Sequence, residues 1–317
     1  MIEQAYGHRP VYVIIEDDAG AIQAGLPLFY IKSKLAGHRL VCLPGAQACD
    51  PLVSNQHEYD QLVAFALDFM QRHHTKSLEL RTSQHFRLDS RKFGREMKEY
   101  SCFILNLDRD LQALESSLKK DSIRRRIKKA SASGLQLVLG ESLNDVKYFY
   151  RLYLHLRKNL GLLPQPYLFF SNMFIIMSKY KKIDILHAKY NNQIVSSLII
   201  LKYKDTVHYE FGASRLDMMH LGISPFLLWE AIKKAKHDGY KRFDFGRTSD
   251  DNTSLVQFKL KWGTTCEALP YYFIPGLGNM ATIRRKSLSK AMMSYAIHSS
   301  PPVLCQLMGR TLYKHLV

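Results

Sequence analysis

A lysine in the last third of the chain lies where its ammonium group could do chemistry. Lys259 follows Phe258 in a helix-prone segment that starts after Asn252 or Thr253 and ends at Gly263, which fits a left-handed C-cap. Aromatic neighbours would remove part of the water from the ammonium group. A partly desolvated positive charge stabilises a developing oxyanion or a phosphate. The alternative is an exposed lysine on an amphipathic helix.

The stretch before this helix adds two charged side chains. Residues 241–245 alternate as in a short strand, with two phenylalanines on one face and Asp244 on the other. The small polar residues from Gly246 onward should end this strand. Arg247 could bind a phosphate or a carboxylate with two hydrogen bonds. A salt bridge between Arg247 and a nearby aspartate is an equal alternative, and the same ambiguity applies to Asp244.

Two weaker candidates lie earlier in the chain. Asp50 precedes Pro51 in a loop, where its carboxylate could accept the proton of an attacking amine. Arg157 could bind a pyrophosphate group. The histidines show no metal-ligand spacing, so we predict no metal site. The five cysteines are widely spread, which favours buried free thiols over a disulfide framework.

The elements that must position these groups alternate between strands and helices. Strands are predicted at 11–16, 21–31, 39–43, 77–81, 101–107, 135–139, 183–190, 194–203, 207–213 and 267–274, and helices at 59–72, 111–133, 145–160, 167–180 and 223–236. The predicted buried faces hold Leu62, Phe65, Ala66 and Phe69 in one helix, and Tyr148, Leu152, Tyr153 and Leu156 in another. Asn191 and Asn192 should form a hairpin turn, and Ser224 should cap a helix. This order predicts an α/β fold in which helices pack on a mixed sheet.

Charge is the strongest global feature of the sequence. The 317 residues carry a formal net charge of +17, which predicts an anionic partner such as tRNA, a nucleotide sugar, a lipid pyrophosphate or an anionic membrane face. Basic residues cluster at 119–129, and the segment 281–317 contains Lys and Arg but no acidic residue. The alternative for the net charge is that it reflects only a generally basic proteome, and the alternative for the cluster at 119–129 is a solvated charged helix face.

The cellular location of the protein can also be predicted from the sequence. No run approaches the roughly 18–20 apolar residues of a spanning helix, and the first 30 residues lack the apolar core of a signal peptide. We therefore predict a cytoplasmic protein. The basic amphipathic segment 303–317 could lie peripherally on the inner face of a membrane or pack on its own domain.

Two motifs together resemble the C-terminal signature of the Fem family. They are Asp244-Phe245-Gly246-Arg247 and, after a Ser/Thr/Asp loop, Phe258-Lys259 with Trp262-Gly263. This family comprises peptidoglycan-bridge aminoacyltransferases and Fem-like proteins of exopolysaccharide gene clusters. The resemblance implies two tandem domains of the GNAT acyltransferase fold with the site in the cleft between them.

The resemblance also implies a division of the chain. It assigns a GNAT-like domain to 1–110, a basic helix to 111–134, a second GNAT-like domain to 135–280 and a basic tail to 281–317. The first domain would lack the N-terminal helix of its relatives. A long helical hairpin, which tRNA-docking members insert in the second domain, has no room here. The sequence therefore resembles the compact, exopolysaccharide-associated branch more closely.

The implied reaction is transfer of an aminoacyl or acyl group to an amine of a cell-wall precursor or surface-polysaccharide intermediate. The resemblance implies that Lys259 stabilises the tetrahedral intermediate and that Phe258 packs beside Lys259. It also implies that Trp262 belongs to the substrate site. It implies no permanently bound cofactor and an aminoacyl-tRNA donor, with acyl-CoA as the other possibility. The turn 215–225 has a single glycine, Gly222, so it would form a poor pyrophosphate nest for acetyl-CoA. The alternatives are a CoA-dependent N-acetyltransferase acting on a sugar amine and a non-catalytic module that holds tRNA or an anionic glycan.

Overall fold

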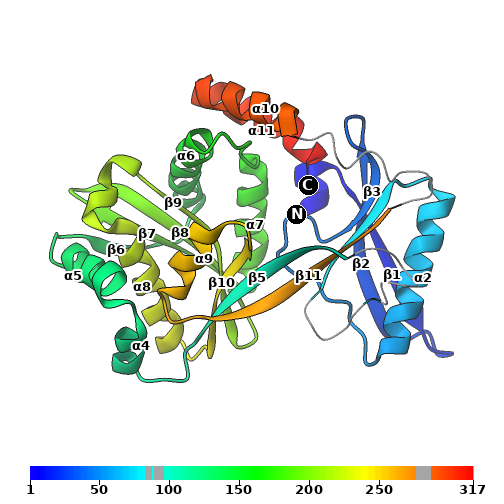
Figure 1. The fold of residues 1–317 in the computed structure, drawn as a ribbon, viewed down its shortest axis with the longest axis horizontal. Helices are drawn as coiled ribbons and strands as arrows, with labels where there is room; N and C mark the ends of the chain where they lie inside the picture. Colours follow the sequence, from blue (N-terminus) through cyan, green and yellow to red (C-terminus); the bar gives the residue numbers. More distant parts are fainter. Residues whose placement is uncertain (83–87, 89–95, 276–286, 317) are drawn as a thin grey trace. The chain divides into compact units, whose positions relative to one another are not determined.

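The computed structural model describes residues 1–82, 88, 96–275 and 287–316, and its elements form two compact units (Figure 1). Unit 1 consists of Met1, 102–267 and 293–310. Unit 2 consists of 2–101, 268–292 and 311–317, as far as these residues are described. The basic residues Arg284, Arg285 and Lys286 lie outside the described part.

Unit 2 is a small sheet covered by one long helix. Its elements are α1 (Ile2–Tyr6), β1 (Arg9–Glu16), β2 (Ile22–Ser33), β3 (Gly37–Cys42), α2 (Gln56–Arg72) and β4 (Ser77–Arg81), with parts of β5 (Glu96–Asn106) and β11 (Thr265–Pro275) and the short helical turn η4 (Tyr313–His315). The strand order is β1-β2-β3-β4-β11, with β3 parallel to β4. The hairpin between β1 and β2 turns at Gly20, whose φ of +78° favours glycine. Phe65 was expected in the core, but it is 54% exposed, because the buried stripe of α2 runs through Tyr59, Leu62, Val63, Ala66 and Met70 instead.

Unit 1 is a larger mixed sheet with helices on both faces. Its elements are α4 (Leu111–Ser117), the π-helical turn η1 (Lys120–Arg124), α5 (Arg125–Ser131), β6 (Gln136–Gly140), α6 (Leu143–Asn159), α7 (Tyr167–Lys179), β7 (Ile183–Tyr190), β8 (Gln193–Tyr203), β9 (Thr206–Ser214), η2 (Leu216–Leu221), α8 (Ile223–His237), β10 (Arg242–Ser249) and α9 (Thr253–Leu260). The strand order is β11-β5-β10-β9-β8-β7-β6. Strands β6 to β9 are antiparallel neighbours, whereas β9 and β10 are parallel. The predicted α/β mixed sheet is confirmed.

The core of unit 1 lies between the sheet and α8. The inner face of α8 (Leu228, Ala231, Ile232 and Ala235) is buried there, together with Val207, Phe243 and Phe245 of the adjoining strands. The predicted cap was wrong: Gly222, with φ of +73°, precedes the helix, and Ser224 lies within its first turn. Gly222 also allows close packing, since a Cβ there would lie 2.8 Å from the Arg126 carbonyl oxygen.

Two further helix predictions need correction. The helix expected over 111–133 is interrupted at Leu118, whose extended backbone (ψ 139°) lets its buried side chain reach the core and separates α4 from η1 and α5. In α6 the predicted inner residue Tyr148 is 45% exposed, and Val146 and Phe149 are buried instead. The apolar stripe of α6 is therefore rotated from the predicted position.

The C-terminal helices α10 (Ser287–Ser299) and α11 (Pro302–Leu312) contribute their residues 293–310 to unit 1. Ile297 and Cys305 are buried. Gly309 lies so close to Pro164 that an added Cβ would clash with the Pro164 carbonyl oxygen. This part of the tail therefore packs on the connection between α6 and α7. Within the described residues, no helix is both long and apolar enough to cross a membrane.

Candidate active site

Strands β9 and β10 provide the framework of the site. They pair in parallel through only three residue pairs, the last of which joins His208 to Asp244. Strand β10 continues to Ser249, so the prediction that it ends before Gly246 was wrong. Gly246 has φ of +77°, which bends the strand without terminating it and requires glycine there. The two strands thus lose their pairing just beyond the His208–Asp244 level.

A buried carboxylate orients an imidazole at this level. The Oδ2 atom of Asp244 lies 3.1 Å from Nδ1 of His208, and its Oδ1 accepts hydrogen bonds from the Gly246 amide (2.7 Å) and the Cys102 thiol (3.2 Å). Burial by itself would raise the pKa of Asp244, but the hydrogen bonds from His208, Gly246 and Cys102 outweigh it and lower the pKa. Asp244 is therefore ionised, which favours the His208 tautomer with hydrogen on Nδ1 and a lone pair on Nε2. The His208 side chain is 36% exposed, so this lone pair is accessible.

Lys259 is buried beside the same strand. Its Nζ atom donates hydrogen bonds to the carbonyl oxygens of Gly246 (2.6 Å) and Arg247 (3.1 Å) and lies 5.3 Å from the centre of the Phe103 ring. The residue is 4% exposed, so the alternative of a solvent-exposed lysine is wrong. Burial lowers the pKa of Lys259 to about 8, against the opposing effect of Asp244 and Cys102. Since an ammonium group has three N–H bonds, two carbonyls leave one for another acceptor.

The aromatic residues of the motif have different surroundings. Phe258 is half-buried and lines a cavity, with its ring 6.2 Å from that of Trp262. Trp262 has no exposed surface and packs in the core against Phe245. The position of Trp262 suits support of α9 better than contact with a substrate. Asn252 caps α9 by accepting a hydrogen bond from the Leu255 amide, as the sequence predicts.

Of the remaining candidates, Arg157 and Asp50 lie apart from this cluster along the chain, whereas Arg247 belongs to β10. The guanidinium of Arg157 donates from Nε and Nη2 to the Leu163 carbonyl oxygen at 3.1 and 2.8 Å, so it fixes the segment before α7. Arg247 is half-buried, and its carbonyl oxygen is one of the two acceptors for Lys259. Asp50 belongs to unit 2, where its side chain is exposed.

A small cavity of about 160 Å³ lies between β8, β9, α8 and Phe258. Three of its hydroxyls form a chain, with Oγ of Ser214 at 2.7 Å from that of Ser196 and 2.9 Å from that of Ser224. The hydroxyl of Ser197 is buried without a hydrogen-bond partner among the described residues. This cavity therefore offers polar contacts to a small polar or partly polar group.

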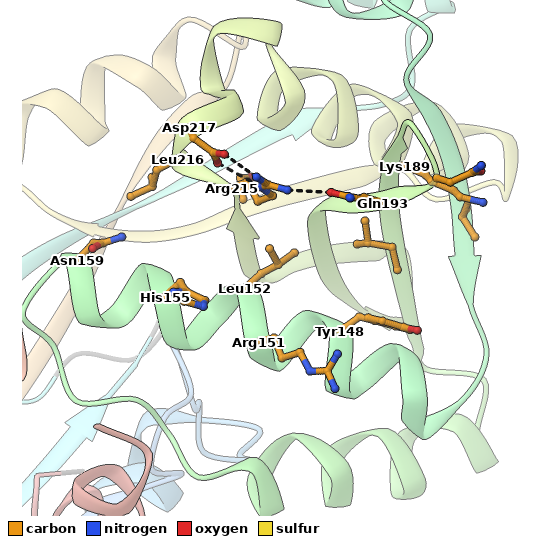
Figure 2. Close-up of a pocket in the computed structure, with 14 residues that line it drawn as sticks. Tyr148, Arg151, Leu152, His155, Asn159, Lys189, Gln193, Arg215, Leu216 and Asp217 are labelled. Atoms are coloured by element: carbon orange, nitrogen blue, oxygen red, sulfur yellow. Dashed lines mark hydrogen bonds and ion pairs between the residues drawn. The ribbon is translucent and has the colours of Figure 1, made fainter. Parts of the chain in front are cut away.

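A larger cavity of about 980 Å³ adjoins it, since Ser214 and Leu216 line both. Along α6 it is bordered by Tyr148, Arg151, Leu152, His155 and Asn159, and across from them lie Gln193, Arg215 and Asp217 (Figure 2). The Arg215 guanidinium is already bound to Asp217 and to Gln193 (2.6 and 3.0 Å). By contrast, the side chains of Arg151 and Lys189 form no hydrogen bond or ion pair with the described residues. Two cations of this cavity are thus available to an anion.

His208 and the cavity cations were not identified from the sequence. The only sequence signal for His208 is a polar side chain between Val207 and Tyr209 in an apolar strand. In the residues that the structure describes, no group of three or more His, Cys, Asp or Glu side chains is placed to hold a metal ion.

Known proteins resemble both the sequence and the fold. Residues 117–259 match the family model described as an acetyltransferase (GNAT) domain. A crystal structure of FemX is similar with a TM-score of 0.63 and 13% identity, over 84% of this chain and 89% of that chain. The C-terminal domain of a putative lysylphosphatidylglycerol synthetase from Agrobacterium fabrum is similar with a TM-score of 0.58 and 13% identity, over 94% and 88% of the two chains.

A third structure, a tandem GNAT protein from the clavulanic acid biosynthesis pathway, is similar with a TM-score of 0.51 and 10% identity, over 84% and 83% of the two chains. At these identities the likeness concerns the fold. No curated protein matches the sequence.

Proposed function

We propose that this protein is an acyltransferase that moves an aminoacyl group from an activated ester to an amine. The proposal is supported by the match of residues 117–259 to a GNAT acetyltransferase domain model and by the similarity of the fold to FemX. The observation that carries the proposal is the His208 imidazole, oriented by the buried Asp244 carboxylate beside the end of the β9–β10 pairing. The acceptor would be an amine of a cell-wall precursor or surface-polysaccharide intermediate.

The reaction needs a base, an oxyanion donor and alignment of two substrates. The amine nitrogen attacks the ester carbonyl carbon and forms the C–N bond, and the carbonyl electron pair moves onto oxygen. Nε2 of His208 takes the proton that the amine loses. When the intermediate collapses, the C–O bond to the carrier breaks, and the proton passes from His208 to the departing oxygen. Proton and electrons therefore balance without a metal or a redox partner.

Lys259 would stabilise the oxyanion through its remaining N–H bond. Its ammonium is already held by two carbonyls, so little reorganisation is needed when charge develops on the substrate. The small cavity beside Phe258 fits the acyl part of the donor, because a cavity of about 160 Å³ accommodates a side chain of a few heavy atoms. The cationic large cavity next to it suits a phosphate-bearing part of a substrate.

An N-acetyltransferase that uses acetyl-CoA is the second candidate, because the matching family model describes acetyltransferases. The turn before α8 argues against this second candidate, because it has few free N–H groups to bind the pyrophosphate of acetyl-CoA. The Gly222 amide already donates to the Met219 carbonyl oxygen, and Pro225 has no N–H. The net charge of +17 suits a polyanionic donor such as tRNA.

Transfer assays with two donors test the proposal. The protein is given either tRNA charged with radiolabelled amino acids or radiolabelled acetyl-CoA, with a nucleotide-linked muropeptide and an amino sugar as acceptors. We expect label from charged tRNA on an acceptor amine. Label from acetyl-CoA alone would replace the first candidate with the second.

The histidine is tested in the same assay. His208→Gln should lower the rate by about 10²–10⁴-fold, the usual contribution of a general base. The control His237→Gln, at a histidine whose side chain is 90% exposed, should leave the rate unchanged. Equal rates for both variants would remove His208 from the reaction.

A further inference from the structure

The C-terminal helices expose several large apolar side chains, although α10 also buries one, Ile297. In α11 the buried residues are Cys305 and Gly309. On other sides of the two helices, Tyr295 is 77%, Val303 75%, Leu304 48% and Leu307 55% exposed. A helix that only packs on its own domain turns its large apolar residues inward. In α11, large apolar residues face outward instead. Clustered exposed apolar residues of this kind mark interaction surfaces.

The inner face explains how the helices stay in place without these side chains. The Sγ atom of Cys305 lies 3.3 Å from the Ile297 carbonyl oxygen, which ties α11 to α10. A Cβ at Gly161 would clash with Ser294, and one at Gly309 would clash with Pro164, so glycines allow close approach of the helices to unit 1. These inner contacts therefore hold the helices on unit 1.

The charge of the segment is complementary to an anionic surface. Residues 281–317 contain Arg284, Arg285, Lys286, Lys290, Arg310 and Lys314 and no acidic residue. Arg310 follows Leu307 by three positions, so the two lie on neighbouring parts of the same helix surface. Apolar side chains flanked by cations are the composition of helices that lie in the interface of an anionic membrane.

We propose that α10 and α11 form a docking surface for an anionic lipid bilayer, made of Tyr295, Val303, Leu304 and Leu307 with Arg310 at its edge. The helices lie parallel to the membrane, with the apolar side chains among the upper acyl chains and Arg310 at the lipid phosphates. This inference is independent of the proposed reaction, since none of these residues belongs to the candidate active site.

Sedimentation with vesicles tests the docking surface in the full-length protein. The protein is mixed with vesicles of phosphatidylglycerol and phosphatidylcholine, or of phosphatidylcholine alone, at low and high salt. We expect binding to the anionic vesicles, weakened by high salt, and little binding to the neutral ones. No binding to the anionic vesicles at low salt would overturn the proposal.

A matched pair of variants locates the surface. Tyr295→Ser with Leu304→Ser should weaken binding by about tenfold or more through the lost apolar contact. The control Tyr180→Ser with Leu139→Ser removes residues of similar exposure, 69% and 48%, elsewhere in unit 1 and should bind like the unaltered protein. All four positions are exposed, so the fold should be retained, and circular dichroism checks this.

Equal vesicle binding by both variants would assign the interaction to another part of the protein. A second copy of the chain is the other possible occupant of the surface. Light scattering without lipid detects it: if the first variant changes only the oligomeric state, the surface is a protein interface and the membrane proposal fails.

Discussion

Two sets of cations in unit 1 differ in how their charges are used. Lys259 is 4% exposed, and two backbone carbonyls of β10 accept hydrogen bonds from its ammonium group. Arg151 and Lys189 border the large cavity and have no hydrogen-bond or ion-pair partner among the described residues. The buried charge is costly and fixed, whereas the open charges keep their side-chain freedom.

The difference indicates different roles for the same kind of group. Lowering the pKa of Lys259 from 10.5 to about 8 corresponds to ~3 kcal/mol against its charged form. A fold tolerates such a cost where a preorganised charge is useful, as beside a reacting group. The cavity cations border open space and suit binding of an anion. Substitutions at the two places should therefore affect different kinetic constants.

The largest effect is expected at Lys259. Lys259→Met keeps the length and apolar part of the side chain but removes the charge, so kcat should fall by about 10²–10³-fold. Single-turnover acyl transfer measures this loss. Lys261→Met, at an exposed neighbour in the same segment, is the matched control and should keep its kcat. Full turnover by the Lys259 variant would leave the lysine with a purely structural role in joining α9 to β10.

The second effect concerns the carboxylate behind His208. Asp244→Asn keeps the shape but removes the charge that fixes the imidazole tautomer, so kcat should fall by about 10²-fold with little change in KM. A purely structural role would predict a loss of stability without a change in kcat for the folded enzyme. Circular dichroism measures the folded fraction, and an unchanged kcat per folded molecule would contradict the orienting role of Asp244.

The third effect should appear in KM and not in kcat. Arg151→Gln with Lys189→Gln removes the two available cations of the large cavity, which should raise KM for a phosphate-bearing substrate by about tenfold. The control Lys147→Gln removes an exposed cation from α6 that does not line the cavity. If kcat fell and KM stayed constant, these cations would act on the reacting groups and the contrast with Lys259 would disappear.

The sequence was sufficient for local features and for the fold class. Asn252 caps α9, and Asn191 and Asn192 turn the β7–β8 hairpin with φ of 46° and 63°, because such short-range geometry depends on a few adjacent residues. The mixed α/β sheet of the GNAT type is confirmed by the match of residues 117–259 to a GNAT domain model and by the similar structures. The substrate, the donor and the location remain predictions.

Features that depend on distant parts of the chain could not be predicted. His208 gains its role from a parallel register with Asp244, and the two strands are separated by η2 and α8. No local pattern encodes that register. The predicted buried face of α6 was also wrong. Tyr148 and Phe149 are both aromatic, and only packing against the sheet decides which of them is buried. Residue type located the β10–α9 segment, but only tertiary packing brings His208 of β9 next to Asp244.

The smallest expected effect is the pH dependence of stability at Lys259. Its pKa is lower in the folded protein, so the unfolded chain binds more protons between pH 8 and 10.5, and the free energy of unfolding should rise with pH in this window. From pH 7 to 9 the rise should be about 1 kcal/mol larger in the unaltered protein than in Lys259→Met. Urea unfolding of both proteins at several pH values measures it. Parallel curves would indicate that the ammonium is better solvated than its burial implies, and the proposed contrast between a costly fixed charge and free cavity charges would lose its energetic basis.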